Sequence, residues 1–168
     1  MRGLIAAAAL AAASLATAAP TSATAQPASA LDPAVAAARA EARRTLPIFW
    51  TRFAANSPDY DSFVVQVDFP KPRGGAEPVW MMVLRQEGAE VVGRLANKPA
   101  EAPGLLGSEV RIPASSIVDW SYTRDGRAYG HFTTRALLDR MSPDMRVKAQ
   151  MTFAPTALEK PPLQSGTR

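Results

Sequence analysis

The chain has 168 residues, with 19 Lys and Arg against 15 Asp and Glu, one histidine and no cysteine, so its formal net charge is +4 at pH 7. The lack of cysteine excludes a disulfide framework and thiolate metal sites, so a packed core must stabilise the fold. The positive excess is mild and its only tight cluster is Arg39, Arg43 and Arg44, which is typical of a solvated helix face and does not indicate nucleic-acid binding.

A secretory signal peptide is predicted over residues 1–25. Arg2 precedes an uncharged apolar run over residues 4–16, and a small-residue site follows at 23–25. The run is shorter than the roughly 20 apolar residues that a transmembrane helix needs. We therefore expect cleavage after Ala25, with an earlier cut at a similar site over 16–18 left open. The product is then a periplasmic or secreted protein with no transmembrane anchor and a flexible leader over 26–31.

A long amphipathic helix is predicted to follow the leader. Asp32 supplies an N-cap and Pro33 the first helical position. Apolar side chains recur at helical spacing and form one stripe: Val35, Ala38, Ala42, Leu46, Phe49, Trp50 and Phe53. Pro47 lacks the N–H that a helix interior requires, so we expect two helical pieces lying on one core.

Three strands are predicted next. Residues 62–69 alternate between apolar and polar side chains, as in a half-buried strand. Residues 79–84 are apolar at every position, which indicates an interior strand covered on both faces, with Trp80 in the core. A turn at Glu87-Gly88 leads into a strand over 90–96. In that register Arg85 lies opposite Glu90, Leu84 opposite Val91 and Trp80 opposite Leu95.

The second half predicts another hairpin and two C-terminal elements. A short strand around 110–112 precedes a strand over 118–123, and Asp125-Gly126 is a strong signal for a two-residue turn. This turn pairs Tyr122 with Tyr129 and Trp120 with His131. A helix is expected from Thr133 to Met141, ended by Ser142-Pro143, then a strand over 147–153 and a disordered tail over 154–168.

These elements predict one α+β domain over residues 32–153. The expected architecture is a small twisted antiparallel sheet built from hairpins and packed with N-terminal and C-terminal helices.

Four landmarks resemble a bacterial family known only as domain of unknown function 2314, over residues 45–140. They are Glu77-x-x-Trp80, Leu95-Ala96-Asn97-x-Pro99, Ile117-x-Asp119-Trp120-x-Tyr122 and Gly130-x-Phe132-Thr133-x-Arg135. The resemblance implies no reaction, substrate or cofactor. It leads us to expect histidine after the glutamate, where this chain has Pro78, so a metal or acid/base role of that histidine is absent.

The sequence predicts no cofactor and no metal site, because clustered ligands are missing. A hydrolase using His131 as base would need Asp119 to orient it, but the predicted register places the two on opposite faces. Asp119 and Arg135 are expected either to form a structural ion pair, to cap the helix N-terminus through the carboxylate, or to hold a ligand. A structural role, as an ion pair or as a cap, is the outcome that we favour over a ligand site.

The remaining candidates are Glu77, Asn97, Tyr122 and Tyr129. Glu77 and Asn97 lie at the ends of one hairpin and could line the same edge, although Asn97 also suits a strand-end turn with an unusual backbone angle. Tyr122 and Tyr129 are near a turn and could form an exposed aromatic platform.

Two functions are carried forward. The first is a non-enzymatic periplasmic binding or accessory module, whose partner is another envelope protein or a cell-wall-derived ligand. The alternative is a cell-envelope hydrolase that uses carboxylates such as Glu77 and Asp119. It would require one pocket holding both acids about 5–9.5 Å apart.

Overall fold

The computed structural model describes residues 31–159. The predicted signal peptide, almost all of the leader and the tail from residue 160 lie outside the described residues. Nine helices and strands occur in this part of the chain, with 3-10 turns at Ala114–Ser116 and Leu138–Arg140: α1 Pro33–Ala55, β1 Tyr60–Pro70, β2 Ala76–Glu87, β3 Glu90–Leu95, β4 Glu109–Pro113, β5 Ile117–Arg124, β6 Arg127–Gly130, α2 Phe132–Ala136 and α3 Pro143–Thr152.

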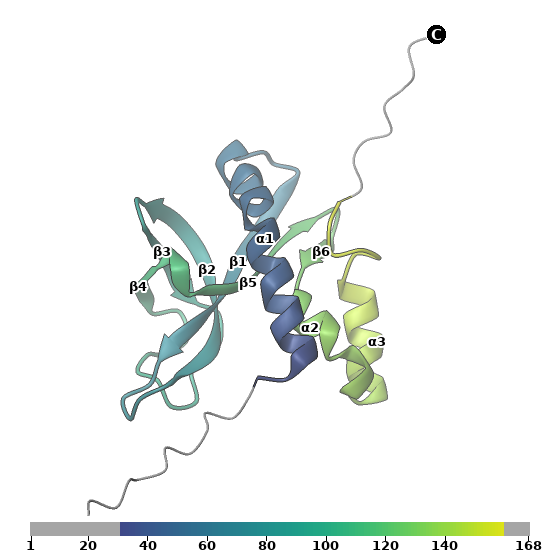
Figure 1. Cartoon of the computed structure of the whole chain (residues 1–168). Helices are drawn as coiled ribbons and strands as arrows, with labels where there is room; N and C mark the ends of the chain where they lie inside the picture. The colour runs from purple at the N-terminus through teal and green to yellow at the C-terminus, as the bar shows by residue number, and fades with distance from the viewer. Residues whose placement is uncertain (1–30, 160–168) are drawn as a thin grey trace, which may run out of the picture. The chain divides into compact units, whose positions relative to one another are not determined.

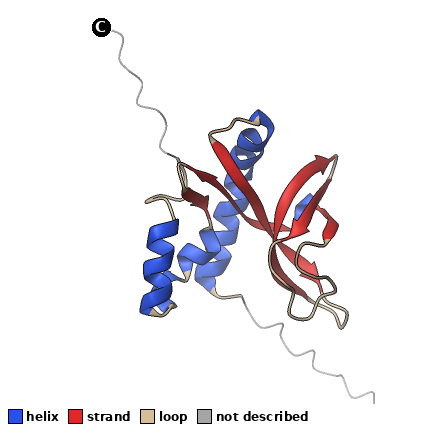
Figure 2. Cartoon of the chain, turned by 180° about the vertical axis from the view of Figure 1, so that it is seen from behind, coloured by secondary structure: helices blue, strands red, loops and turns tan. Residues whose placement is uncertain are grey.

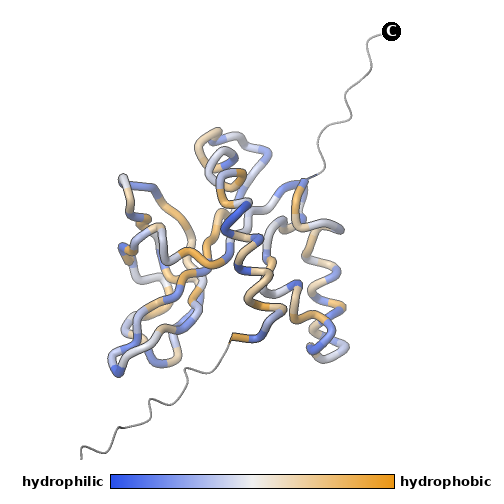
Figure 3. Tube along the Cα trace, in the orientation of Figure 1, coloured by the Kyte–Doolittle hydropathy of each residue, from blue (hydrophilic) through white to orange (hydrophobic). Residues whose placement is uncertain are grey.

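The six strands form one antiparallel sheet in the order β4-β3-β2-β1-β5-β6. The helix α1 lies across the sheet and packs mainly on β5, while α2 and α3 follow β6 (Figures 1 and 2). Figure 3 shows hydrophobic stretches in the strands and in α1 that meet where this helix lies against the sheet. The predicted α+β class is confirmed. None of the helices over residues 31–159 is long and apolar enough to cross a membrane.

The first helix is continuous, so the prediction of two pieces is wrong. Asp32 caps it as expected, because Oδ1 accepts a hydrogen bond from the amide of Ala34 at 2.8 Å. Pro47 lies inside the helix. A proline in a helix interior costs about 3 kcal/mol, but Ala42 and Phe49 on either side of it are both fully buried against the core. Keeping both halves on one axis buries that stripe, and this outweighs the missing hydrogen bond.

The second strand is covered on one face only. Val79, Met81 and Val83 are buried, whereas Met82 between them is 47% exposed and Trp80 is partly exposed. The prediction of a strand buried on both faces, with Trp80 in the core, is therefore wrong. The helices pack on the part of the sheet around β5, which leaves the second face of β2 without a covering layer in the described structure.

The β2–β3 hairpin forms, but its register differs from the prediction. Glu87 lies opposite Glu90, and Gly88 takes the first turn position with φ +60°. The turn is therefore one residue later than predicted, because glycine adopts this left-handed conformation without strain. A bulge at Leu84 then brings Met81 opposite Leu95.

The β5–β6 hairpin is confirmed from its turn to the pair of Ser121 with Gly130. Asp125 and Gly126 have φ of 51° and 67°, and Tyr122 lies opposite Tyr129. The strand ends at Gly130, where a Cβ atom would lie 2.1 Å from the carbonyl oxygen of Trp120. His131 has φ 53° and is not paired in the ladder, so the predicted register pair with Trp120 does not form, although the His131 amide still donates to the carbonyl of Trp120 at 2.9 Å.

The elements after β6 agree only in part with the sequence patterns. The helix expected over 133–141 occurs as α2 and the 3-10 turn at Leu138–Arg140, and it ends before Ser142 as predicted. Ser142-Pro143 also begins α3, because Ser142 Oγ accepts from the amide of Met145 and proline suits the first helical position. The predicted strand over 147–153 is therefore helical up to Thr152. The segment 154–159, expected to be disordered, continues against the sheet. Ala154 is buried, and its amide donates to the carbonyl of Ala128 at 2.9 Å.

The Asp125-Gly126 turn gives a first prediction. Gly126→Val is expected to lower the free energy of unfolding by about 1 kcal/mol or more, because a β-branched residue tolerates positive φ poorly. No neighbouring atom lies within 4 Å of a Cβ at this position, so the loss reports backbone strain alone. Denaturant unfolding measures it. Thr123→Val, on the adjacent strand, is the control, and equal stability of the two variants would contradict the turn.

Candidate functional site

Asp119 on β5 is fully buried and holds the start of α2. Its Oδ1 accepts from the amides of Trp120 (2.8 Å) and Phe132 (3.1 Å). Its Oδ2 accepts from the amide and the hydroxyl of Thr133, at 2.8 and 2.6 Å. Burial raises the pKa of Asp119, and these hydrogen bonds, led by the Thr133 hydroxyl, oppose the rise. The carboxylate therefore caps the helix, as one of the sequence hypotheses proposed.

Arg135 does not form an ion pair with Asp119, so that one of the two structural alternatives is wrong. Its Nε donates to the carbonyl of Gly130 at 2.8 Å, and Nη2 donates to Ala128 at 3.1 Å and to Ala154 at 3.0 Å. The guanidinium thus joins the end of β6 to the C-terminal segment. Burial lowers its pKa and the charge of Asp119 opposes this effect, but an arginine remains protonated at neutral pH.

Glu77 and Asn97 both fix the loop after β3. The Glu77 carboxylate accepts from the amides of Ala100, Glu101 and Ala102, and these hydrogen bonds, led by Ala102, lower its pKa. Asn97 Oδ1 accepts from the amide of Trp80 at 2.7 Å. Asn97 has no positive φ, so its side chain and not its backbone angle serves the strand-end turn.

The structure does not bring Glu77 and Asp119 together. On the intervening strand β1, Glu77 lies opposite Phe69 and Asp119 lies opposite Gln66. These positions differ by an odd number of residues, so the two carboxylates project from opposite faces of the sheet. The shared pocket that a two-carboxylate hydrolase requires is absent from the described part of the chain.

His131 lies between two aromatic rings, away from any carboxylate hydrogen bond in the described structure. Its imidazole centroid is 4.7 Å from that of Trp80 and 4.9 Å from that of Phe153. Its Nδ1 atom is buried and has no hydrogen-bond partner among residues 31–159. Burial, followed by the charge of Arg135, lowers the pKa of His131 to about 4. The imidazole is therefore neutral at pH 7 and packs as an aromatic ring.

Tyr122 and Tyr129 stack with centroids 5.6 Å apart, but they do not form an exposed platform. Tyr122 is completely buried, because Trp120, Phe63 and Tyr60 surround it, and only Tyr129 is partly exposed. Burial, with the charge of Glu159 second, raises the pKa of Tyr122 to about 12. The predicted exposure of Tyr122 is wrong.

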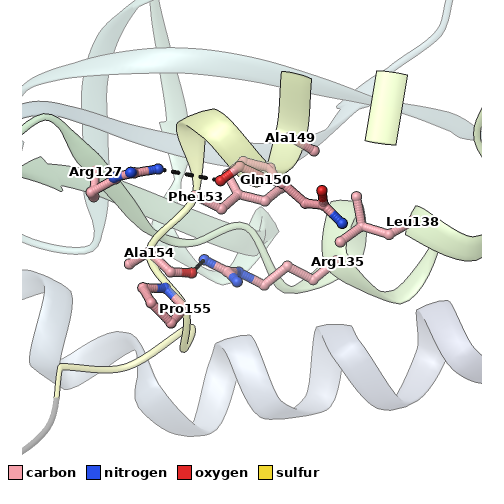
Figure 4. Close-up of a pocket in the computed structure, with 8 residues that line it drawn as sticks. All are labelled: Arg127, Arg135, Leu138, Ala149, Gln150, Phe153, Ala154 and Pro155. Atoms are coloured by element: carbon pink, nitrogen blue, oxygen red, sulfur yellow. Dashed lines mark hydrogen bonds between the residues drawn. The ribbon is translucent and has the colours of Figure 1, made fainter. Parts of the chain in front are cut away.

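A pocket that sequence reasoning missed lies where β6, α2 and α3 meet the C-terminal segment (Figure 4). It has a volume of about 370 Å³ and is lined by Arg127, Arg135, Leu138, Ala149, Gln150, Phe153, Ala154 and Pro155. This volume suits a small organic ligand. The pocket was missed because its wall depends on α3, which the sequence analysis assigned as a strand. The Ser142-Pro143 cap was the signal that could have revealed it.

The pocket combines two arginines with apolar side chains. Arg127 Nη1 donates to the carbonyls of Met151 (2.6 Å) and Gln150 (3.2 Å), at the C-terminal end of α3. Arg135 lies over Phe153, with Cζ 4.8 Å from the ring centroid. Within residues 31–159, neither guanidinium has an acidic side chain within 4 Å. Two positive charges beside an apolar wall can bind an anion that carries an apolar body.

No group of three His, Cys, Asp or Glu side chains that could hold a metal ion occurs in the described residues.

Comparison with known proteins gives a family match and two relatives. A family model described as "Uncharacterized protein conserved in bacteria (DUF2314)" matches residues 32–153. The chain is 27% identical over 110 residues to "Uncharacterized protein YegJ" of Escherichia coli (strain K12). The aligned region covers 65% of this chain and 67% of that protein.

The second relative is a longer protein. The chain is 27% identical over 125 residues to a "Putative ankyrin repeat protein" of Neisseria meningitidis serogroup B. The aligned region covers 70% of this chain and 49% of that protein. This chain therefore spans about half the length of the Neisseria relative. No solved structure matches the chain.

Proposed function

This chain belongs to the bacterial DUF2314 family, and we propose that it is an exported, non-enzymatic binding module that holds a small anion in the pocket of Figure 4. The observation that carries the proposal is the pair Arg127 and Arg135, which line an apolar pocket with no acidic partner among the described residues. Export is supported by the signal-peptide pattern over residues 1–25.

The contacts that the ionisable residues already make inside the fold support a binding role over a catalytic one. The carboxylates of Asp119 and Glu77 are each occupied by backbone amides, and His131 is held neutral between aromatic rings. A general acid or base must reach its substrate within hydrogen-bond distance. These three side chains instead stabilise the scaffold on which the pocket is built.

The pocket wall indicates the chemistry of the ligand. Leu138, Ala149 and Pro155 offer apolar surface, and the arginine donors not used by backbone carbonyls can bind carboxylate or phosphate oxygens. The Gln150 amide, drawn at the same wall, adds a neutral hydrogen-bonding group (Figure 4). A cell-wall-derived fragment that joins an anionic group to an apolar part fits this combination.

Benzoate is a suitable probe, because it carries one carboxylate on an aromatic body. Titration of the isotope-labelled chain with sodium benzoate, followed by NMR at constant ionic strength, is expected to give saturable shifts at Arg127, Gln150 and Phe153. Phenyl phosphate in parallel distinguishes carboxylate from phosphate recognition. Shifts that grow linearly, as they do with added sodium chloride, would contradict the proposal.

Arg127→Gln is expected to weaken benzoate binding at least fivefold, because it removes one of the two positive charges. Arg127→Lys retains the charge and should keep most of the affinity. Arg94→Gln is the matched control, since it removes an exposed arginine of β3 that does not line the pocket. An equal dissociation constant for the wild-type chain and Arg127→Gln would refute the assignment.

A further inference from the structure

A second basic cluster lies where the end of α1, the start of β1 and the end of β5 meet Glu159 of the C-terminal segment. Glu159 Oε2 lies 3.0 Å from Arg52 Nη2 and 3.3 Å from Arg124 Nη1. The hydroxyl of Tyr60 donates to the same oxygen at 3.4 Å. Three donors from three different elements thus converge on one carboxylate oxygen.

The two guanidinium groups are held in place by an aromatic ring. The Cζ atoms of Arg52 and Arg124 lie 5.3 and 5.4 Å from the centroid of Tyr60. Cation–π contacts of this kind position arginine side chains without using their hydrogen-bond donors. The donors of Arg52 therefore remain available for an anion, whereas Arg124 Nη1 is shared between the Tyr60 hydroxyl at 3.4 Å and the carboxylate.

The carboxylate of Glu159 does not provide a hydrogen-bond partner for every polar group of this cluster. Arg52 Nε is a buried donor without a hydrogen-bond partner among residues 31–159, and Glu159 Oε1 is a buried acceptor without one. Glu159 neutralises one of two positive charges. Asp125, 3.6 Å from Arg124 Nε, is 86% exposed and contributes little through solvent. Buried polar groups left unpaired in this way indicate that a further polar group can enter.

A cavity of about 380 Å³ lies beside the cluster and gives access to it. Arg124, Tyr129, Pro155, Thr156 and Glu159 line it. Glu159 belongs to a segment that forms neither helix nor strand, and its backbone is tied to the sheet through Ala157, whose carbonyl accepts from the amide of Gly130 at 2.7 Å. Moving Glu159 out of the cluster therefore requires no change in the sheet.

We propose that Arg52, Arg124 and Tyr60 form a second, carboxylate-binding site, which Glu159 occupies as an internal ligand. An external carboxylate takes the place of the Glu159 side chain and extends into the neighbouring cavity. The segment that carries Glu159 thus lowers the affinity of the site for external carboxylates by direct competition. This site is separate from the pocket of Figure 4 and does not depend on it.

The test compares the unchanged chain with Glu159→Gln, using N-acetyl-dialanine as the probe and its C-terminal amide as the uncharged control. Calorimetry is expected to show at least tenfold tighter binding of the acid by Glu159→Gln, and no binding of the amide. Adding Arg52→Gln to this variant should abolish the gain in affinity, because it removes a charge that contacts the carboxylate.

The unchanged chain provides an independent measurement if Glu159→Gln does not fold. A high concentration of the acid should shift the NMR resonances of Glu159, Arg124 and Ala157, and the amide should not. The absence of these shifts, or binding by Glu159→Gln that is no tighter than in the unchanged chain, overturns the proposal. A gain in affinity that survives Arg52→Gln also overturns it. Neither result bears on benzoate binding in the first pocket.

Discussion

Asp119→Ala is expected to lower the free energy of unfolding by about 3–5 kcal/mol. The substitution leaves three backbone amides and the Thr133 hydroxyl without their acceptor in a fully buried position. Removing one partner of a buried charged network costs this much, because the remaining groups stay desolvated. Thermal and denaturant unfolding measure the loss.

Asp68→Ala is the matched control for this prediction. Asp68 pairs with Arg39 at 2.9 Å, but its side chain is about one third exposed, so its removal should cost less than about 1 kcal/mol. Near-native stability of Asp119→Ala would show that the carboxylate does not hold α2 in place. Asp119 would then become the leading candidate for a ligand contact.

The stability of the fold is also expected to fall by about 2–3 kcal/mol between pH 6.5 and pH 4 through His131 alone. Its pKa is about 4 in the folded chain, against the ordinary histidine value of 6.5, and each pKa unit corresponds to about 1.4 kcal/mol. The unfolded chain binds the proton first as the pH falls through this window, so protonation favours unfolding. Above pH 6.5 the effect is absent.

His131→Asn isolates this contribution. Asparagine tolerates the positive φ of 53° at this position and does not titrate. Asp119, whose pKa is raised by burial, remains in both proteins and its opposing contribution cancels in the comparison. The variant should be less stable at pH 7, because it loses the stacking on Trp80 and Phe153, but its stability should depend less on pH. Parallel pH profiles for the two proteins would contradict a buried neutral histidine.

Local signals in the sequence predicted those parts of the fold that local chemistry determines. Asp125-Gly126 specifies its turn because both residues adopt positive φ, and Asp32-Pro33 specifies the start of α1. The same chemistry was interpreted only in part at Ser142-Pro143, which follows the end of one helical segment and also starts α3. The break predicted at Pro47 is wrong for a different reason. The hydrogen bond that proline removes is a local loss, whereas the burial of Ala42 and Phe49 on the sheet is a tertiary gain that the helical pattern alone does not measure.

At the candidate site, too, local features were predictable from the sequence and long-range contacts were not. The triad of Asp119 and His131 does not form, but strand alternation is not the reason: His131 lies outside the ladder and its ring contacts Trp80, which shares a sheet face with Asp119. The Asp119 carboxylate is instead occupied by the amides of α2, and this capping role was among the alternatives. The sequence could not predict that Arg135 would bind three carbonyls, because two of them belong to β6 and one to the segment after α3. Arg52 and Glu159 are 107 positions apart, and only the folded chain brings them together.

The most direct measurement is the benzoate titration followed at the side chains that line the pocket of Figure 4. The Gln150 side-chain amide and the Arg135 Nε–H resonance are expected to move with the same dissociation constant as the backbone amides around them. Binding should be lost or weakened in Arg127→Gln and unchanged in Arg94→Gln. If these two side-chain resonances stay fixed while benzoate saturates shifts elsewhere, the pocket between β6 and α3 is not the binding site.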